Sequence, residues 1–218
     1  DQRHRQCLQT EQLYRSISRQ ESFQKRLHPR RRYHAGLKAL ETLANLCQFL
    51  PGLSQPVAIG SIRVRILRRE GGNLHLLLVG KDTNAEPYSS LIAGNRMRER
   101  IHVAGFRNNA PELIAASEVL VQPSRSGEGL PRAVMEAMGY GTPVVITDTG
   151  GGKEVVVDGV SGFVVPVEDP AAISRRVEQL YSDPELRRQL AENGKKNLED
   201  QYSSARTTDK YLAYFSTL

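Results

Sequence analysis

The chain has 218 residues, of which 39% are hydrophobic and 6% aromatic, and it contains no tryptophan. This composition is adequate for a soluble core of helices packed on a sheet. No apolar run approaches the ~18 residues that a transmembrane helix needs, which excludes a spanning segment from this sequence. Cys7 and Cys47 form no CxxC pair and no metal-ligand spacing with the five histidines, so a reduced, cytoplasmic compartment is expected.

The net charge of +6 is concentrated in one part of the chain. Residues 1–38 carry ten lysines and arginines against three acids, so this stretch is +7 and the remainder sums to −1. We treat residues 1–35 as a basic N-terminal segment, whose widely spaced apolar residues favour a weakly amphipathic helix. Nucleic-acid or anionic-membrane binding is one interpretation, but a solvated helix or a segment separated from its partner domain is the commoner explanation, and we predict no nucleic-acid partner.

From residue 36 onward the pattern becomes orderly. Residues 36–50 predict a helix that Pro51-Gly52 ends, and residues 56–67 are rich in β-branched residues and predict a strand. Five short apolar runs follow: His75–Gly80, Ile101–Phe106, Val119–Ser124, Thr142–Asp148 and Gly162–Pro166. Near-continuous apolar strands separated by helical stretches indicate a parallel sheet covered on both faces. We therefore predict an α/β fold over residues 36–218, built on a Rossmann-like parallel sheet with helices on both faces.

The last quarter of the chain predicts helices. They are expected over Pro170–Ser182, Pro184–Gln201 and Ala205–Phe215. Asp169-Pro170 and Asp183-Pro184 both place an aspartate that caps a helix before a proline at the first helical position. These two dipeptides predict where the first two helices begin.

One loop is favourably placed to bind an anion. Ligands of such sheets lie beyond the carboxyl ends of the strands, where loops lead into helices. The loop Pro123–Pro131 follows a predicted strand and opens a predicted helix over Pro131–Tyr140. Gly127 and Gly129 let the backbone approach a ligand, and the helix supplies exposed amides and the positive end of its dipole. This arrangement favours a phosphate or diphosphate.

Two glutamates accompany this loop. Glu128 lies within it and Glu136 lies eight residues later, inside the helix. Two acceptors at this separation suit two sets of sugar hydroxyls better than one shared proton. For an isolated pair, a dipole-stabilising glutamate and a solvent-facing one would be the simpler explanation. His75 and His102 begin apolar strands and are expected to be structural, and no metal-binding or Ser-His-Asp group can be assembled.

The residues around the glutamates form a longer pattern. EGLPRAVMEAMGYGTPVV, then TDTGGGKE and DGVSGFVVP, resemble the family 4 glycosyltransferases of the GT-B fold, from about Leu74 to the C-terminus. The resemblance implies a retaining hexosyltransferase type of enzyme that uses a nucleoside-diphosphate sugar and needs neither metal nor cofactor. This chain would be the donor-binding, C-terminal half of such an enzyme.

The resemblance also assigns roles to residues. It implies that Glu128 is catalytic and contacts the donor sugar, and that Glu136 binds the ribose hydroxyls. The donor would also be bound by the loop backbone and by the turn that borders the base; these residues are Gly127, Gly129, Leu130, Pro131, Phe106 and Arg107. The front-face reaction implied is departure of the diphosphate and attack of the acceptor hydroxyl on the same face.

The sequence departs from the family pattern at one point. The family carries an arginine and a Lys-Gly pair after its first strand, and these residues hold the diphosphate. The nearest match is Arg32 to Gly36, in which Ala35 occupies the lysine position, so Arg32 is the remaining cation. Three later arginines are open substitutes, and the sequence does not choose among them: Arg63, Arg65 and Arg68.

The resemblance implies partners beyond the donor. The missing part would be an N-terminal half that binds a glycan, lipid or small-molecule acceptor. The start at Asp1, without Met, is consistent with a processed or trimmed protein. The expected location is the cytoplasm, with the inner membrane surface as a peripheral site. Two alternatives stay open: a non-catalytic nucleotide-sugar-binding module that acts with a partner chain, and a sugar-nucleotide epimerase.

Overall fold

The structure is a computed structural model, and it describes residues 63–69, 73–81, 83, 85–86, 88–95, 98–125 and 129–216. The expectations for the basic segment 1–35 and for the helix over residues 36–50 lie outside this part of the chain. So do the assignments made to Arg32, Gly127 and Glu128.

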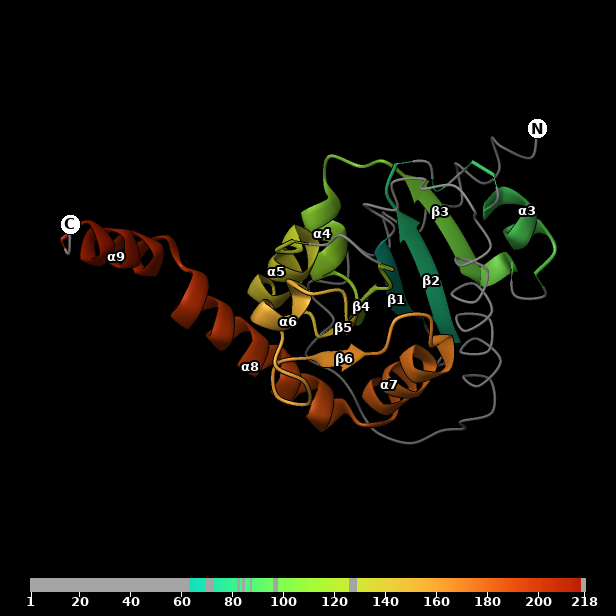
Figure 1. Cartoon of the computed structure of the whole chain (residues 1–218). Helices are drawn as coiled ribbons and strands as arrows, with labels where there is room; N and C mark the ends of the chain where they lie inside the picture. The colour runs from blue at the N-terminus through green and yellow to red at the C-terminus, as the bar shows by residue number, and fades with distance from the viewer. Residues whose placement is uncertain are drawn as a thin grey trace.

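Within the described residues, six strands form one sheet in the order β3-β2-β1-β4-β5-β6 (Figure 1). The strands are β1 Arg63–Arg69, β2 Asn73–Val79, β3 Ile101–Gly105, β4 Val119–Gln122, β5 Val144–Thr147 and β6 Phe163–Val165. β2 pairs with β3 in parallel, and β4, β5 and β6 are parallel to one another. The five apolar runs therefore form the five parallel-paired strands, which confirms the Rossmann-like α/β fold.

The strand β1 runs against this pattern. It is antiparallel to both of its neighbours, β2 and β4. Only residues 70–72 separate the end of β1 from the start of β2. A parallel connection needs a crossover of a dozen or more residues, so three residues permit only a hairpin. The expectation of a purely parallel sheet is thus corrected at its centre.

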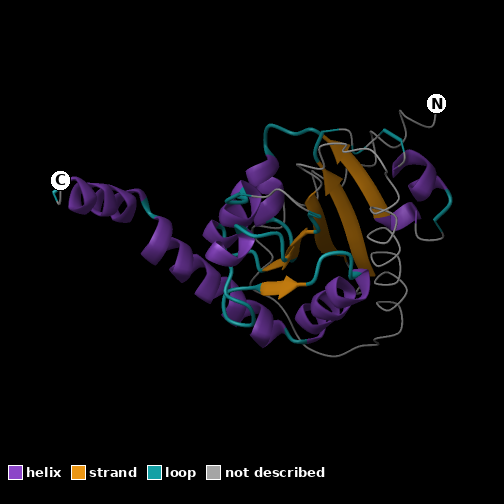
Figure 2. Ribbon diagram, viewed as in Figure 1, coloured by secondary structure: helices purple, strands orange, loops and turns teal. Residues whose placement is uncertain are grey.

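Helices cover both faces of the sheet (Figure 2). Along each strand the side chains alternate between the two faces, so Leu76 and Leu78 join one core cluster while Leu77 and Val79 join another. The helix α7 (Pro170–Ser182) packs against β4, β5 and β6 in the first cluster. On the opposite face, α5 (Arg132–Gly139) packs against β4 and β5, next to α4 (Ala110–Ala115). Shorter helices complete the set: α3 Tyr88–Ala93, η3 Arg98–Arg100 and α6 Gly152–Val155.

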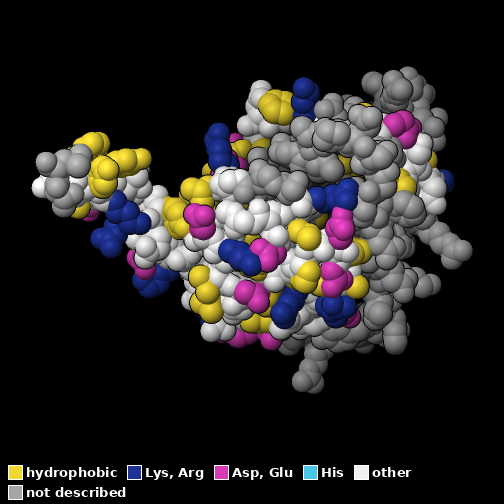
Figure 3. All heavy atoms as spheres, in the orientation of Figure 1, with side chains coloured by type: hydrophobic (Ala, Val, Ile, Leu, Met, Phe, Trp, Pro, Cys, Tyr) yellow, Lys and Arg dark blue, Asp and Glu magenta, His cyan; other side chains and the backbone are white. Residues whose placement is uncertain are grey.

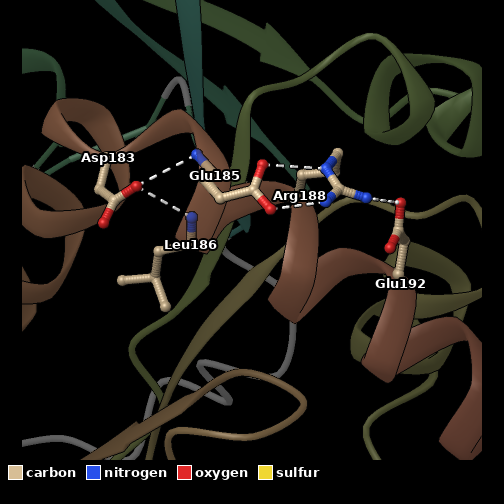
Figure 4. Close-up of polar contacts among 5 residues, drawn as sticks. All are labelled: Asp183, Glu185, Leu186, Arg188 and Glu192. Atoms are coloured by element: carbon tan, nitrogen blue, oxygen red, sulfur yellow. Dashed lines mark hydrogen bonds and ion pairs between the residues drawn. The ribbon is translucent and has the colours of Figure 1, made fainter.

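The two aspartate–proline dipeptides start helices as predicted. The Asp169 carboxylate accepts a hydrogen bond from the Ala172 amide at 2.8 Å, and α7 begins at Pro170. The Asp183 carboxylate accepts from two amides at 3.1 and 3.0 Å at the start of α8 (Pro184–Tyr202; Figure 4). Each carboxylate satisfies amides that have no partner within the helix, and it also stabilises the positive end of the helix dipole.

The C-terminal helices leave the body of the domain. α8 packs along α5 and then runs outward, and α9 (Ser204–Phe215) extends beyond it (Figure 1). Hydrophobic side chains gather on α9 (Figure 3), where Tyr211, Leu212, Tyr214 and Phe215 are each more than 60% exposed. None of the described helices combines the length and the hydrophobicity that crossing a membrane requires.

Candidate functional site

The carboxyl ends of three neighbouring strands are linked by hydrogen bonds. The Thr147 hydroxyl, at the end of β5, donates to the Ser124 carbonyl at 2.5 Å, just after β4. The Asp148 amide donates to the Val165 carbonyl at 2.8 Å, at the end of β6. Thr147 and Ser124 are both buried, so these bonds fix the backbone where the loops leave the sheet.

An ion pair joins the loop that follows β4 to the loop that follows β6, the outer two of these three strands. Arg125, after β4, donates through Nε to a carboxylate oxygen of Glu168, after β6, at 3.0 Å. The Arg125 side chain is 32% exposed and that of Glu168 is 51% exposed. Glu168 has a φ of 59°, and it is the one non-glycine residue with a positive φ among those that the structure describes. Glu168 therefore has a backbone conformation that residues other than glycine rarely adopt.

The helix α5 directs its N-terminus at the same edge. It begins at Arg132, one residue later than the sequence predicts, and Pro131 takes the capping position. The Pro131 carbonyl accepts the amides of Val134 and Met135 at 3.0 and 3.2 Å. A proline has no side-chain acceptor for the first-turn amides, so the positive end of the helix dipole is available to an anion.

Glu136 lies on the second turn of α5. Its side chain is 27% exposed, and its Oε1 is 3.9 Å from an Nη of the far more exposed Arg132. That separation is at the limit of an ion pair and is worth little to stability at a surface. Glu136 is thus a partly buried carboxylate whose described ionic contact is weak, one turn from the helix N-terminus.

The end of β3 contributes the other side of this edge. The Gly80 amide donates to the Gly105 carbonyl at 2.9 Å, which aligns the ends of β2 and β3. Phe106 follows directly, and it is 71% exposed, next to an exposed Arg107. Three strand spacings, roughly 14 Å, separate β3 from β4 in the sheet. The exposed ring of Phe106, after β3, and the N-terminus of α5, after β4, therefore lie at the same edge of the sheet but three strands apart.

Comparison with known proteins identifies the family of the chain. The sequence profile of the family described as "Glycosyl transferases group 1" matches residues 63–197, more than half of the chain. The chain belongs to the glycosyl transferases group 1 family. EpsD of Bacillus subtilis is 34% identical over 153 residues, which are 69% of this chain and 39% of EpsD.

Solved structures share the fold of this chain. HepE of Anabaena, crystallised in complex with UDP, is 24% identical with a TM-score of 0.61, and the match covers 65% of this chain and 40% of HepE. The C-terminal domain of the group 1 family protein LpcC of Francisella tularensis is 20% identical with a TM-score of 0.57, and 80% of this chain matches 83% of that domain. The group 1 chain thus spans about 40% of EpsD and HepE.

The structure of the group 1 chain brings part of the predicted site together. The exposed residues Gly129 and Leu130 lead into Pro131 and so lie beside the start of α5, with Glu136 one turn further on. Phe106 and Arg107 lie at the same edge of the sheet but on the side of β3. The roles assigned to these residues stay predictions.

The direction of β1 separates the three arginines that the sequence left open. Arg63 lies opposite Val79 in the register, at the carboxyl edge of β2. Arg65 pairs with Leu77 in the middle of the strands, and Arg68 pairs with a residue at the amino end of β2. Only Arg63, among these three, has its backbone at the edge where the predicted donor site lies.

Sequence reasoning missed the ionic contacts of this edge. Arg125 lies within the loop Pro123–Pro131 but has no predicted role, and Glu168 is not among the predicted site residues. Sequence reasoning also missed the Lys153–Asp148 pair, whose Nζ and carboxylate oxygen are 2.5 Å apart. The available signal was position, because Arg125, Asp148 and Glu168 each lie at the end of a predicted apolar run or within two residues of that end. Position alone did not indicate which side chains pair.

The two strand histidines lie away from this edge. His75 is near the amino end of β2 and His102 is near the amino end of β3, with Nδ1 of the first 2.9 Å from Nε2 of the second. Their rings are stacked, with centroids 5.2 Å apart. This placement agrees with the expectation that they are structural. Across the part of the chain that the structure describes, no three His, Cys, Asp or Glu side chains gather as a metal-binding group.

Proposed function

We propose that this chain is the donor-binding domain of a glycosyltransferase and that it binds a nucleoside-diphosphate sugar at the carboxyl edge of its sheet. The observation that carries the proposal is the N-terminus of α5, which opens at this edge behind a glycine-containing loop and has Glu136 one turn away. Family membership supports it. The HepE structures, one with UDP and another with UDP-glucose, lend support through a related fold that binds such a ligand.

The arrangement suggests a division of labour. The α5 amides and dipole suit the diphosphate, because hydrogen bonds from amides to a charged acceptor are stronger than those to a neutral one. Glu136 suits the ribose hydroxyls, since a carboxylate accepts two hydrogen bonds. Phe106 offers an exposed ring on which a base can stack. Glu128, which the sequence places before α5, would orient the donor sugar.

The proposed reaction is transfer of a hexosyl group with retention. The acceptor hydroxyl would attack the face from which the diphosphate leaves. The α5 dipole and the loop amides would stabilise the charge that develops on the leaving group, a contribution of several kcal/mol in such sites. Leaving-group stabilisation would then come from protein groups and not from a metal ion.

The second half of the reaction centre would come from another domain. The chain spans about 40% of EpsD and HepE, and its match to the LpcC C-terminal domain covers most of that domain. We infer that a preceding domain binds the acceptor, which is a glycan, a lipid or a small molecule. The proposed location is the cytoplasm, with the inner membrane surface as a peripheral site.

Calorimetry with UDP, UMP, GDP and GMP tests the proposal. We expect the diphosphate of the preferred base to bind about tenfold more tightly than its monophosphate, because the second phosphate gains charge-assisted bonds to amides. Uridine and guanosine serve as controls for binding through the base and ribose alone. Equal affinities for diphosphate and monophosphate would remove phosphate recognition from the proposal.

A further inference from the structure

Exposed hydrophobic side chains gather on the last described helix, α9 (Figure 3). They are between 61% and 64% exposed: Tyr211, Leu212, Tyr214 and Phe215. No residue of α9 is buried. The Ser203 hydroxyl caps the helix by accepting a hydrogen bond from the Arg206 amide at 3.3 Å, so α9 forms although its apolar side chains stay in solvent. Single hydrophobic residues are normal at a surface, but a contiguous group of this kind marks an interaction surface.

The apolar side chains of α9 form one stripe. Successive residues of an α-helix are about 100° apart, which places Tyr211 and Phe215 about 40° from each other. Leu212 and Tyr214 lie on either side of these two, so the four side chains share an arc of about 160°. The rings of Tyr214 and Phe215 contact each other edge to face, with centroids 5.6 Å apart. The charged residues of the helix share the remaining arc: Arg206, Asp209 and Lys210.

The charge of α9 argues against an anionic lipid surface as the partner of this stripe. Asp209 offsets one of the two cations, Arg206 and Lys210, so the helix carries a net charge of +1. Recognition of an anionic membrane takes a cluster of about four to eight lysines and arginines. The same small charge means that two copies of α9 would repel each other little. Tyrosines also suit a protein interface, because the ring packs while the hydroxyl stays in water.

The area of the stripe is sufficient for a weak pairing of two copies. A tyrosine or phenylalanine removes roughly 150–250 Å² from water when it is buried, so the three partly exposed rings and Leu212 present roughly 400–550 Å² on each chain. Two facing stripes would bury roughly 1,000 Å², which is the lower limit for a specific interface. Because α9 extends beyond the body of the domain, two copies of the helix can face each other (Figure 1).

We propose that α9 binds α9 of a second copy of this chain through the apolar stripe, in a weak two-fold dimer. The stripe of one helix covers the stripe of the other, and the charged residues remain in water. A two-fold contact uses the same patch on both copies and leaves none free, so the association stops at two chains. This inference stands on α9 alone and does not depend on the proposed function.

Sedimentation velocity of the full chain over a range of concentrations tests the proposal. We expect the mass of one chain at about 1 µM and a rise towards two chains by about 300 µM, because interfaces at the lower size limit bind with micromolar or weaker affinity. Tyr211→Glu places a carboxylate at the centre of the stripe. It should weaken the association about tenfold or more, because a charge buried without a partner opposes pairing.

Ala213→Glu is the matched control. It makes the same change of charge on the charged side of the same helix, so it should leave the association unchanged. Tyr211 and Ala213 are both exposed, so the Tm of each dilute variant should equal that of the unmodified chain.

Three results would overturn the proposal. They are a chain that stays monomeric at every concentration, growth beyond two chains, and equal weakening by the two substitutions. For a monomeric chain, flotation with phosphatidylglycerol-containing vesicles identifies the partner instead. Vesicle binding that Tyr211→Glu abolishes would assign the stripe to a membrane, and no vesicle binding would assign it to a preceding domain of a longer polypeptide.

Discussion

Replacement of Glu136 by glutamine should weaken the binding of UDP by roughly ten- to hundredfold, with little change in the stability of the fold. The expected loss is about 1.5–3 kcal/mol, because a charged acceptor is removed from hydroxyl donors that become buried on binding. The stability change should stay below about 0.5 kcal/mol, since the contact with Arg132 is 3.9 Å long and Arg132 is largely exposed. Calorimetry and thermal unfolding measure the two quantities.

Two further variants sharpen this test. Arg132→Gln breaks the same ionic contact without removing a carboxylate, so its unfolding temperature should match that of Glu136→Gln. Glu128→Gln should spare UDP and weaken only the intact sugar donor, because its proposed contact is with the sugar. If Glu136→Gln leaves donor affinity unchanged while lowering the unfolding temperature, Glu136 is a structural residue and not a ribose ligand.

We expect the second large effect in catalysis: this chain alone should not transfer sugar to any acceptor. A donor-binding domain without the acceptor-binding domain cannot align an acceptor hydroxyl. Alignment lowers the activation free energy by about 7–11 kcal/mol in well-oriented reactions. Such a domain also cannot exclude water, so slow hydrolysis of the donor is the most that we expect. The described residues form one sheet, and the chain spans 39% of EpsD.

The assay is release of nucleoside diphosphate from a panel of sugar donors. It is run with and without candidate lipid and glycan acceptors, and a full-length group 1 glycosyltransferase serves as the positive control. Acceptor-dependent turnover at ordinary enzyme rates, about 1 per second or faster, would contradict the need for a second domain. Tight donor binding without any turnover would favour the non-catalytic binding module.

Much of the fold could be predicted because its signals are local. Each parallel-paired strand of the sheet is a short apolar run, since a strand covered on both faces has few polar positions. The helix starts at Pro170 and Pro184 could be read directly, because an aspartate cap and a proline at the first helical position act within four residues. For the same reason, the sequence could place Pro131 at the start of α5 and Glu136 on its second turn.

The remaining features depend on contacts between distant segments. The composition of β1 indicates a strand but not its direction. Its antiparallel direction follows from the connection of only three residues between β1 and β2. That direction, in turn, is what places Arg63 and not Arg68 at the carboxyl edge. The Arg125–Glu168 pair joins residues 43 apart, and a sequence of exposed charges offers no means of choosing partners. The φ of Glu168 is likewise set by its surroundings and not by its residue type.

We expect a nucleoside diphosphate to bind at the carboxyl edge of the sheet, against the N-terminus of α5. Mapping of amide chemical shifts by NMR during a UDP titration tests it most directly. The largest saturable shifts are expected at Arg132, Ala133 and Asp148, and no shifts are expected at His102 and Glu118, which lie at the amino edge. Saturable shifts centred on the amino edge, or no saturable shift at millimolar UDP, the weak limit of specific binding, would contradict it.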